Sequence, residues 1–92
     1  MKPVDLSGRF RAAVRRYPKE TRGRIGRALQ MLERDFGQPH RHQGLGIRKL
    51  SATYFEVRVG LDIRLVFQNC PDCLLCVMAG NHDEVQAFLR GR

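Results

Sequence analysis

The sequence predicts an α+β domain: an N-terminal αα-hairpin packed on one face of a small, mainly antiparallel four-stranded sheet, with a short helix at the C-terminus. Two observations support this prediction. The hydrophobic period is helical up to about residue 36 and becomes two after segment 37–46, which contains glycines and a proline. With 92 residues, 42% of them hydrophobic, the chain can bury one modest core, so we expect a single domain spanning 1–92.

Two helices are predicted in the first 36 residues. The apolar residues of the first recur on one helical face: Leu6, Phe10, Ala13, Val14 and Tyr17. Ser7 or Asp5 can cap its start, and Pro18 ends it and suits the first turn of the second helix. The second helix repeats the pattern with Ile25, Ala28, Leu29, Leu32 and Phe36. Gly37 is a natural stop for it.

Residues 54–68 predict a β-hairpin because apolar and polar side chains alternate on both sides of a short turn at 60–62. A three-residue loop fixes the pairing, with Val59 and Ile63, Val57 and Leu65, and Phe55 and Phe67 on one face, and Arg58 and Arg64, Glu56 and Val66, and Tyr54 and Gln68 on the other. The first face is wholly apolar, so we expect it to face the core.

The remaining elements flank this hairpin. Residues 47–50 predict a preceding strand, and the apolar run 73–79 predicts a covered strand. Residues 84–89 predict the last helix, which Asn81 or Asp83 can cap. Segment 2–6 is too short, and interrupted by Pro3, to be predicted as an edge strand.

The charge indicates an anionic partner. Lys and Arg number 17 against nine Asp and Glu, a net charge of +8, and 14 of the 17 are arginine. Arginine binds phosphate bidentately, so nucleic acid or an acidic protein is expected; the alternative is that arginine simply covers solvated faces. No run approaches the roughly 20 apolar residues of a membrane helix, and the first residues lack a secretion signal. We therefore expect a cytoplasmic protein without membrane contact.

The predicted register sets Arg58 opposite Arg64, and like charges at paired positions are destabilising. Either Glu56, two residues along the same face, neutralises one of them, or the pair binds an anion. Lys49 from the preceding strand could join this patch.

The segment GNHDEV, residues 80–85, joins the last strand to the last helix. A helix start attracts anions, and a histidine there can transfer protons near neutral pH. His82 is therefore a candidate acid or base; the alternative is an exposed histidine beside a helix cap.

The cysteines fall in NCPDCLLC, residues 69–76, where Pro71 and Asp72 predict a turn. Strand geometry puts Cys73 and Cys76 on opposite faces, so three thiolates cannot converge on one ion. A reversible disulfide between Cys70 and Cys73 stays open. The pair His40 and His42 has too few companions for a metal site, so we expect neither metal nor cofactor.

The segments KLSATYFEVRVGLDIRLVFQ and GNHDEVQAFL resemble the core of the RelE/ParE superfamily, the small basic toxins of bacterial type II toxin–antitoxin systems. Nearly the whole chain from Phe10 onward takes part, and the specificity lies in the order and spacing of short motifs. The resemblance implies an mRNA endoribonuclease (mRNA interferase), acting on the ribosome or on free RNA, that inhibits translation and is neutralised by a cognate antitoxin.

The resemblance also implies site residues. Arg64 and Arg58 match the family's phosphate-stabilising arginines, and His82 occupies the position of its acid, base or charge stabiliser. The early part of the last helix often holds a tyrosine in nuclease members, and Phe88 stands there in this chain. We expect Phe88 either to stack on a base or to pack in the core. Arg48, Lys49 and His42 are expected to contact RNA.

Two other functions remain open at this point. A ParE-like toxin inhibits DNA gyrase without hydrolysis, and the missing tyrosine favours this reading slightly. A relic could bind only its antitoxin and operator DNA. In every case an acidic, partly disordered antitoxin would suit a toxin of net charge +8.

Overall fold

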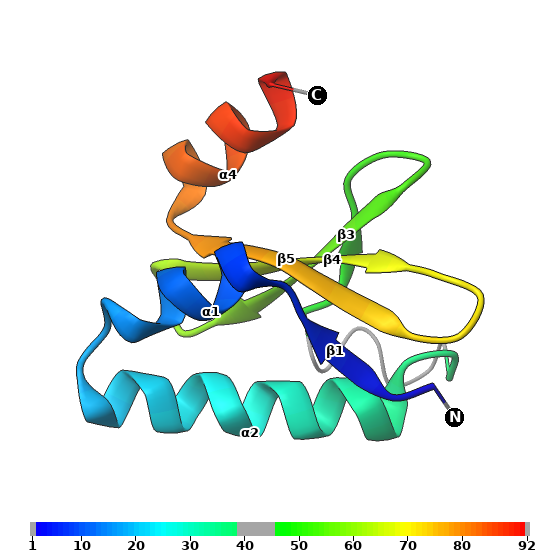
Figure 1. Cartoon of the computed structure of the whole chain (residues 1–92), viewed down its shortest axis with the longest axis horizontal. Helices are drawn as coiled ribbons and strands as arrows, with labels where there is room; N and C mark the ends of the chain where they lie inside the picture. Colours follow the sequence, from blue (N-terminus) through cyan, green and yellow to red (C-terminus); the bar gives the residue numbers. More distant parts are fainter. Residues whose placement is uncertain (1, 39–45, 92) are drawn as a thin grey trace.

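The computed structural model describes residues 2–38 and 46–91. Their elements follow the chain as β1 (Val4–Leu6), α1 (Gly8–Arg15), α2 (Lys19–Asp35), β2 (Arg48–Lys49), β3 (Tyr54–Val59), β4 (Ile63–Asn69), β5 (Leu74–Gly80) and α4 (His82–Arg90). The α+β class matches the prediction, and so does the order of helices and strands from α1 onward (Figure 1). None of the described helices is long and apolar enough to cross a membrane.

The sheet has the strand order β1-β5-β4-β3-β2, one strand more than the four predicted. The additional strand is β1, which pairs parallel to β5 with Val4 opposite Leu74 and Leu6 opposite Cys76. Pro3 does not prevent this, because its carbonyl accepts the bond from the Leu74 amide at 2.9 Å and no amide is needed there. The partner strand lies at the other end of the sequence, so local pattern could not reveal the pairing.

The β3–β4 hairpin has the predicted register throughout, from Tyr54 opposite Gln68 to Val59 opposite Ile63. Its turn depends on Gly60, which adopts φ 66°, a conformation that side chains with a Cβ rarely take. The Arg24 guanidinium of α2 lies directly over Gly60, so a Cβ at this position would collide with it. The turn is therefore held by its own backbone and by a contact from α2.

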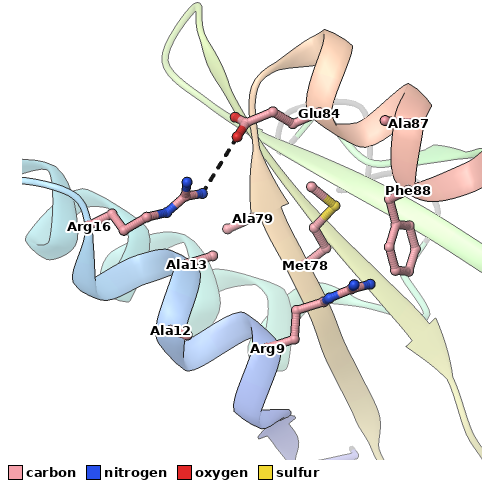
Figure 2. A pocket seen from close by; sticks show the side chains of 9 residues that line it. All are labelled: Arg9, Ala12, Ala13, Arg16, Met78, Ala79, Glu84, Ala87 and Phe88. Carbon is pink, nitrogen blue, oxygen red and sulfur yellow. Dashed lines mark ion pairs between the residues drawn. The ribbon is translucent and has the colours of Figure 1, made fainter.

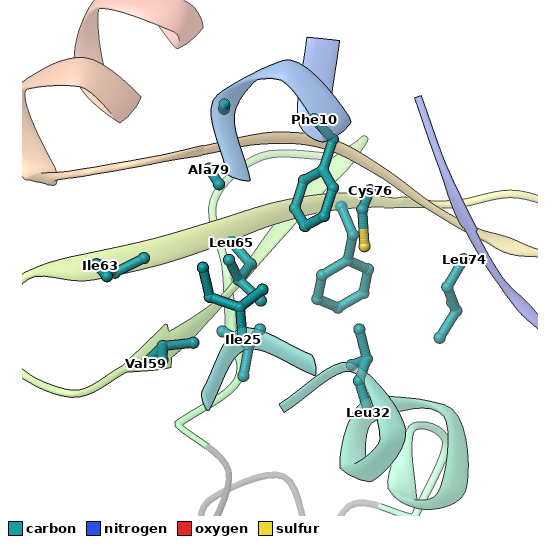
Figure 3. Packing of buried hydrophobic residues seen from close by; sticks show 12 residues of the cluster. Phe10, Ile25, Leu32, Val59, Ile63, Leu65, Leu74, Cys76 and Ala79 are labelled. Carbon is teal, nitrogen blue, oxygen red and sulfur yellow. The ribbon is translucent and has the colours of Figure 1, made fainter. Parts of the chain in front are cut away.

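One face of the sheet is covered by α1 and α2. Buried side chains of both helices meet the inward residues of β3, β4 and β5 there, as in Figure 3: Phe10, Ile25, Leu32, Val59, Ile63, Leu65, Leu74, Cys76 and Ala79. Phe36, the residue that follows α2, packs edge-on against Phe55 and Phe67 at centroid distances of 5.6 and 5.4 Å. This cluster contains the apolar hairpin face that the alternation predicts.

The opposite face has a second core, which α4 covers. Val66 and Val77 of the sheet meet Val85 and Phe88 of the helix there, and all four are buried. The αα-hairpin thus packs on one face, as expected, and the C-terminal helix packs on the other. Val66 lies between Leu65 and Phe67 in β4, and Val77 follows Cys76 in β5, so both alternate with residues of the first core and point to the opposite face. A register shift near Val66 leaves Val77 without a paired residue in β4.

Candidate functional site

The face of the hairpin that lies opposite the first core holds a buried carboxylate between two guanidiniums. Glu56 is only 3% exposed. Its oxygens lie 3.3 Å from an Arg48 nitrogen and 3.7 Å from Arg64 Nε. Arg58 is opposite Arg64 in the register and makes no ion pair within residues 2–38 and 46–91. Glu56 thus forms an ion pair with Arg64, which is the first of the two readings of the arginine pair. Anion binding by Arg58 and Arg64 stays a prediction.

Arg64 is the most enclosed of these cations. Its side chain is 13% exposed, and its Nε has no hydrogen-bond partner among the described residues, because 3.7 Å to Glu56 is longer than a hydrogen bond. A buried donor without an acceptor costs folding free energy. Charge attraction therefore holds this guanidinium near Glu56, but no directional bond locks it, and it can adjust to a ligand.

Two neighbouring hollows share Arg64. The first, of about 360 Å³, is lined by Gly46, Ile47, Arg48, Glu56, Arg58 and Arg64. The second, of about 460 Å³, is lined by Leu61, Asp62, Arg64, Asn81, His82 and Asp83. The fold therefore brings together Arg58, Arg64 and His82, which the sequence only suggested. Arg64 forms the wall between a cationic hollow and one that contains the histidine.

The start of α4 holds His82 at the edge of the second hollow. Asn81 caps the helix: its Oδ1 accepts a bond from the Glu84 amide at 2.8 Å, and the Glu84 carboxylate accepts one from the Asn81 amide at 2.9 Å. This reciprocal capping box fixes the backbone on both sides of His82. The imidazole itself is exposed, so it can meet a ligand.

A groove between α1 and α4 shows how the last helix is anchored (Figure 2). Glu84 of α4 forms an ion pair with Arg16, which follows α1, at 3.6 Å. Arg9 lies over the Phe88 ring at 5.4 Å from its centroid. Phe88 is 8% exposed and packs edge-on against Tyr54 at 5.5 Å. Phe88 therefore belongs to the second core, which confirms the second of its two expected roles. Because the ring is buried there, it does not present a free face to an RNA base.

Of the three residues expected to contact RNA beside the arginine pair, Arg48 lies in the patch, Lys49 does not, and His42 cannot be placed. Lys49 pairs with Phe55, whereas its neighbour Arg48 pairs with Glu56. Paired residues share a face of the sheet, so Arg48 joins the patch and Lys49 points to the other side. His42 and His40 lie outside the described residues.

Pattern reasoning missed Leu61 and Asp62 as site residues and treated them only as turn residues. Both line the second hollow, since the turn brings them beside the start of α4. A signal was available, because Asp62 directly precedes β4 and stands only two positions before Arg64.

The cysteines lie away from these hollows. They are free thiols, with Cys76 buried in the first core and Cys70 and Cys73 half-buried at the β4–β5 turn. Burial raises the pKa of Cys76 to about 12. Partial burial, Asp5 and Cys70 also raise the pKa of Cys73. Raised pKa values disfavour reactive thiolates, and within the described residues no cluster of His, Cys, Asp or Glu could hold a metal ion.

Comparison with known proteins identifies the fold. No family model and no curated protein matches the sequence. Among solved structures, RelE of the archaeal RelE–RelB complex from Pyrococcus horikoshii OT3 has a TM-score of 0.70 at 17% identity, covering 87% of this chain and 93% of that chain. The E. coli DinJ–YafQ toxin–antitoxin complex matches with a TM-score of 0.69 at 16% identity, covering 91% and 96%.

A third structure, the YoeB dimer from Staphylococcus aureus, has a TM-score of 0.68 at 17% identity and covers 88% of this chain and 97% of that chain. Each match spans almost the whole of both chains. The protein therefore has the RelE-type fold, which agrees with the resemblance in its sequence.

Proposed function

We propose that this chain is the toxin of a type II toxin–antitoxin pair and an mRNA endoribonuclease. The carrying observation is that Arg64 lines both hollows, with Arg48 and Arg58 on one side and His82 on the other. RNA cleavage by the adjacent 2′-hydroxyl needs cations around the phosphorus and a proton donor near the leaving oxygen. The fold shared with RelE, YafQ and YoeB supports the same class of activity.

In the proposed reaction the scissile phosphate lies against the guanidiniums of Arg48, Arg58 and Arg64. The 2′-oxygen attacks phosphorus and forms a 2′,3′-cyclic phosphate while the bond from phosphorus to the 5′-oxygen breaks. His82 donates a proton to the departing 5′-oxygen, and a carboxylate accepts the proton of the 2′-hydroxyl. A positioned acid or base of this kind typically contributes about 10²–10⁴-fold to the rate.

Two carboxylates are candidates for the proton acceptor. Glu56 is held between Arg48 and Arg64, and its main effect is to orient those cations. Asp83 lines the hollow with His82 and makes no ion pair in the described part of the chain. Asp83 is therefore the freer acceptor, and it also lies close enough in sequence to influence His82.

The partners follow from the same proposal. RelE is found in complex with RelB, and YafQ with DinJ, and we propose an antitoxin for this chain too. A net charge of +8 favours an acidic, partly disordered antitoxin. The same charge suits a substrate presented on the ribosome, whose RNA is a polyanion.

Brief expression in a bacterial host tests the reaction class. We expect mapping of mRNA 5′-ends to show new cleavage sites within minutes, while a gyrase supercoiling assay with the purified protein shows no inhibition. Inhibited supercoiling with intact mRNA would instead identify a gyrase toxin. Growth without either effect would identify a protein that binds only an antitoxin.

Single substitutions test the site. We expect Arg64→Ala and His82→Ala each to abolish growth arrest and mRNA cleavage, since they remove a phosphate-stabilising cation and the proton donor. Arg27→Ala, on the exposed face of α2, is the matched control and should remain toxic. Circular dichroism checks that each variant is folded, and full toxicity of both site variants would contradict the proposed site.

A further inference from the structure

The two hollows that share Arg64 differ in charge. The first sets three arginines around the single carboxylate of Glu56. The second sets Arg64 against the carboxylates of Asp62 and Asp83. A phosphate is attracted more strongly to the first, because the two carboxylates of the second offset the charge of Arg64. The second hollow therefore suits the part of a nucleotide that is uncharged and rich in N–H donors, which is the base.

The turn between β3 and β4 supplies both an apolar surface and an acceptor to this second hollow. Leu61 is 93% exposed, although exposure of a large apolar side chain to water does not stabilise the fold. The Asp62 carboxylate has no hydrogen bond or ion pair within the part of the chain that the structure describes. Arg24 packs over Gly60 and braces the turn, so both side chains are presented by a supported backbone.

Unstacked RNA bases are recognised through their faces and through hydrogen bonds to their Watson–Crick edges. A carboxylate offers two acceptor oxygens side by side. Among the four common bases, guanine alone presents two adjacent N–H donors on that edge, N1–H and the 2-amino group. A carboxylate beside an apolar surface is therefore matched to guanine better than to adenine, cytosine or uracil.

We propose that the hollow between the β3–β4 turn and the start of α4 binds the base next to the phosphate held by Arg64 and selects guanine, with Leu61 covering the base and Asp62 accepting its two N–H donors. The inference rests on the proposed ribonuclease function, because that function brings RNA to Arg64. It assigns Asp62 to recognition of the base and leaves proton transfer to His82 and Asp83.

Binding of trinucleotides tests the proposal without cleavage. The RNAs U-G-U, U-I-U and U-A-U carry 2′-O-methyl groups, so the 2′-oxygen cannot attack; inosine differs from guanosine only by lacking the 2-amino group. We expect the wild-type protein to bind U-G-U about tenfold more tightly than U-I-U and U-A-U, in keeping with a bidentate base contact. Binding is measured by NMR titration, with shifts expected at the amides of residues 61–62 and 81–83.

Asp62→Asn should reduce the preference for U-G-U over U-I-U to about twofold or less, because an amide offers one acceptor oxygen in place of two. Asp72→Asn, an equal charge change in the exposed β4–β5 turn, is the matched control and should keep the tenfold preference. Equal affinity of the wild-type protein for U-G-U and U-I-U, no measurable binding of any trinucleotide, or an unchanged preference in Asp62→Asn would overturn the proposal.

Cleavage is read separately, by mapping mRNA 5′-ends in bacteria that briefly express the protein. Guanine-selective binding without cleavage rejects the ribonuclease and keeps the base site. Cleavage without guanine-selective binding keeps the ribonuclease and rejects the base site.

Discussion

Glu56 determines how the cations of the site are held. It is the buried carboxylate of the hairpin face, and it faces one enclosed and one exposed guanidinium. Alternation in the sequence predicted that Glu56 would share a face with Arg58 and Arg64, and the structure agrees. What alternation could not predict is its burial beside the side chains of Arg48, on the neighbouring strand β2, and Arg64.

Glu56→Gln should lower the free energy of unfolding by about 1–3 kcal/mol, because it leaves the enclosed Arg64 without a counter-charge. Arg48 adds little to this figure because its side chain is 63% exposed. Urea denaturation measures the change. Glu20→Gln, at an exposed position of α2, is the control and should stay within about 0.5 kcal/mol of the wild type; an equally small effect of Glu56→Gln would show that the ion pair is not stabilising.

Because of Cys76, the free energy of unfolding should decrease with pH in the alkaline range. Its pKa is about 12 in the folded protein against an ordinary value of 9.0, so the folded state retains a proton that the unfolded state releases. The stabilisation of the folded state by the protonated thiol is fully present below pH 9. It is lost as the pH rises toward 12, and the free energy of unfolding then falls by up to about 1.4 kcal/mol per pH unit. Urea denaturation between pH 8 and 10.5 should show a steeper decline for the wild type than for Cys76→Ala, and parallel declines would refute this assignment.

At the scale of elements, the start of α4 is the feature on which the proposed chemistry depends. The capping box of Asn81 and Glu84 holds the turn that carries His82, and Arg16 ties Glu84 to the end of α1. The sequence predicted a cap at Asn81 or Asp83, and the structure selects Asn81. Asp83 is thereby left to face the hollow.

Asn81→Ala should destabilise the protein by about 0.5–2 kcal/mol because the Glu84 amide loses its acceptor. It should also reduce mRNA cleavage, since His82 follows the cap directly. Thermal denaturation and 5′-end mapping measure the two effects. Asn81→Ser restores a capping side chain and should recover both; recovery of stability without recovery of cleavage would indicate that the amide of Asn81 has a separate role at the site.

At the scale of the whole molecule, the basic side chains are unevenly distributed. The net charge of +8 is spread over the helices and the hairpin. Arg48, Arg58 and Arg64 surround the hollow beside Glu56, whereas Arg11, Arg15 and Arg22 line a separate hollow between α1 and α2. The salt dependence of RNA binding should therefore distinguish the general attraction of a positively charged protein from specific contacts between the arginines beside Glu56 and phosphates.

The affinity for single-stranded RNA should fall with salt, with a slope of roughly −2 in log K against log salt if three phosphates are neutralised. Arg58→Ala should make the slope shallower by about 0.7, the value for one phosphate on a single strand. Fluorescence anisotropy between about 50 and 200 mM salt measures this. Arg27→Ala is the charge-matched control on α2, and equal changes in the two variants would mean that the hairpin arginines have no special contact.

The sequence by itself determined the helices, the strands other than β1, and the register of the hairpin. Alternation with period two and a three-residue loop are properties of fewer than twenty neighbouring residues, so the register that places Arg58 opposite Arg64 could be predicted. Helix caps and the turn at Pro71 are equally local. Only the tertiary structure decided that β1 joins the sheet and that α4 covers the opposite face and buries Phe88. It also decided that Arg64 lines two hollows, one of which contains His82. These depend on contacts between segments far apart in the chain, such as Val4 with Leu74, and no periodicity within a segment specifies its distant partner.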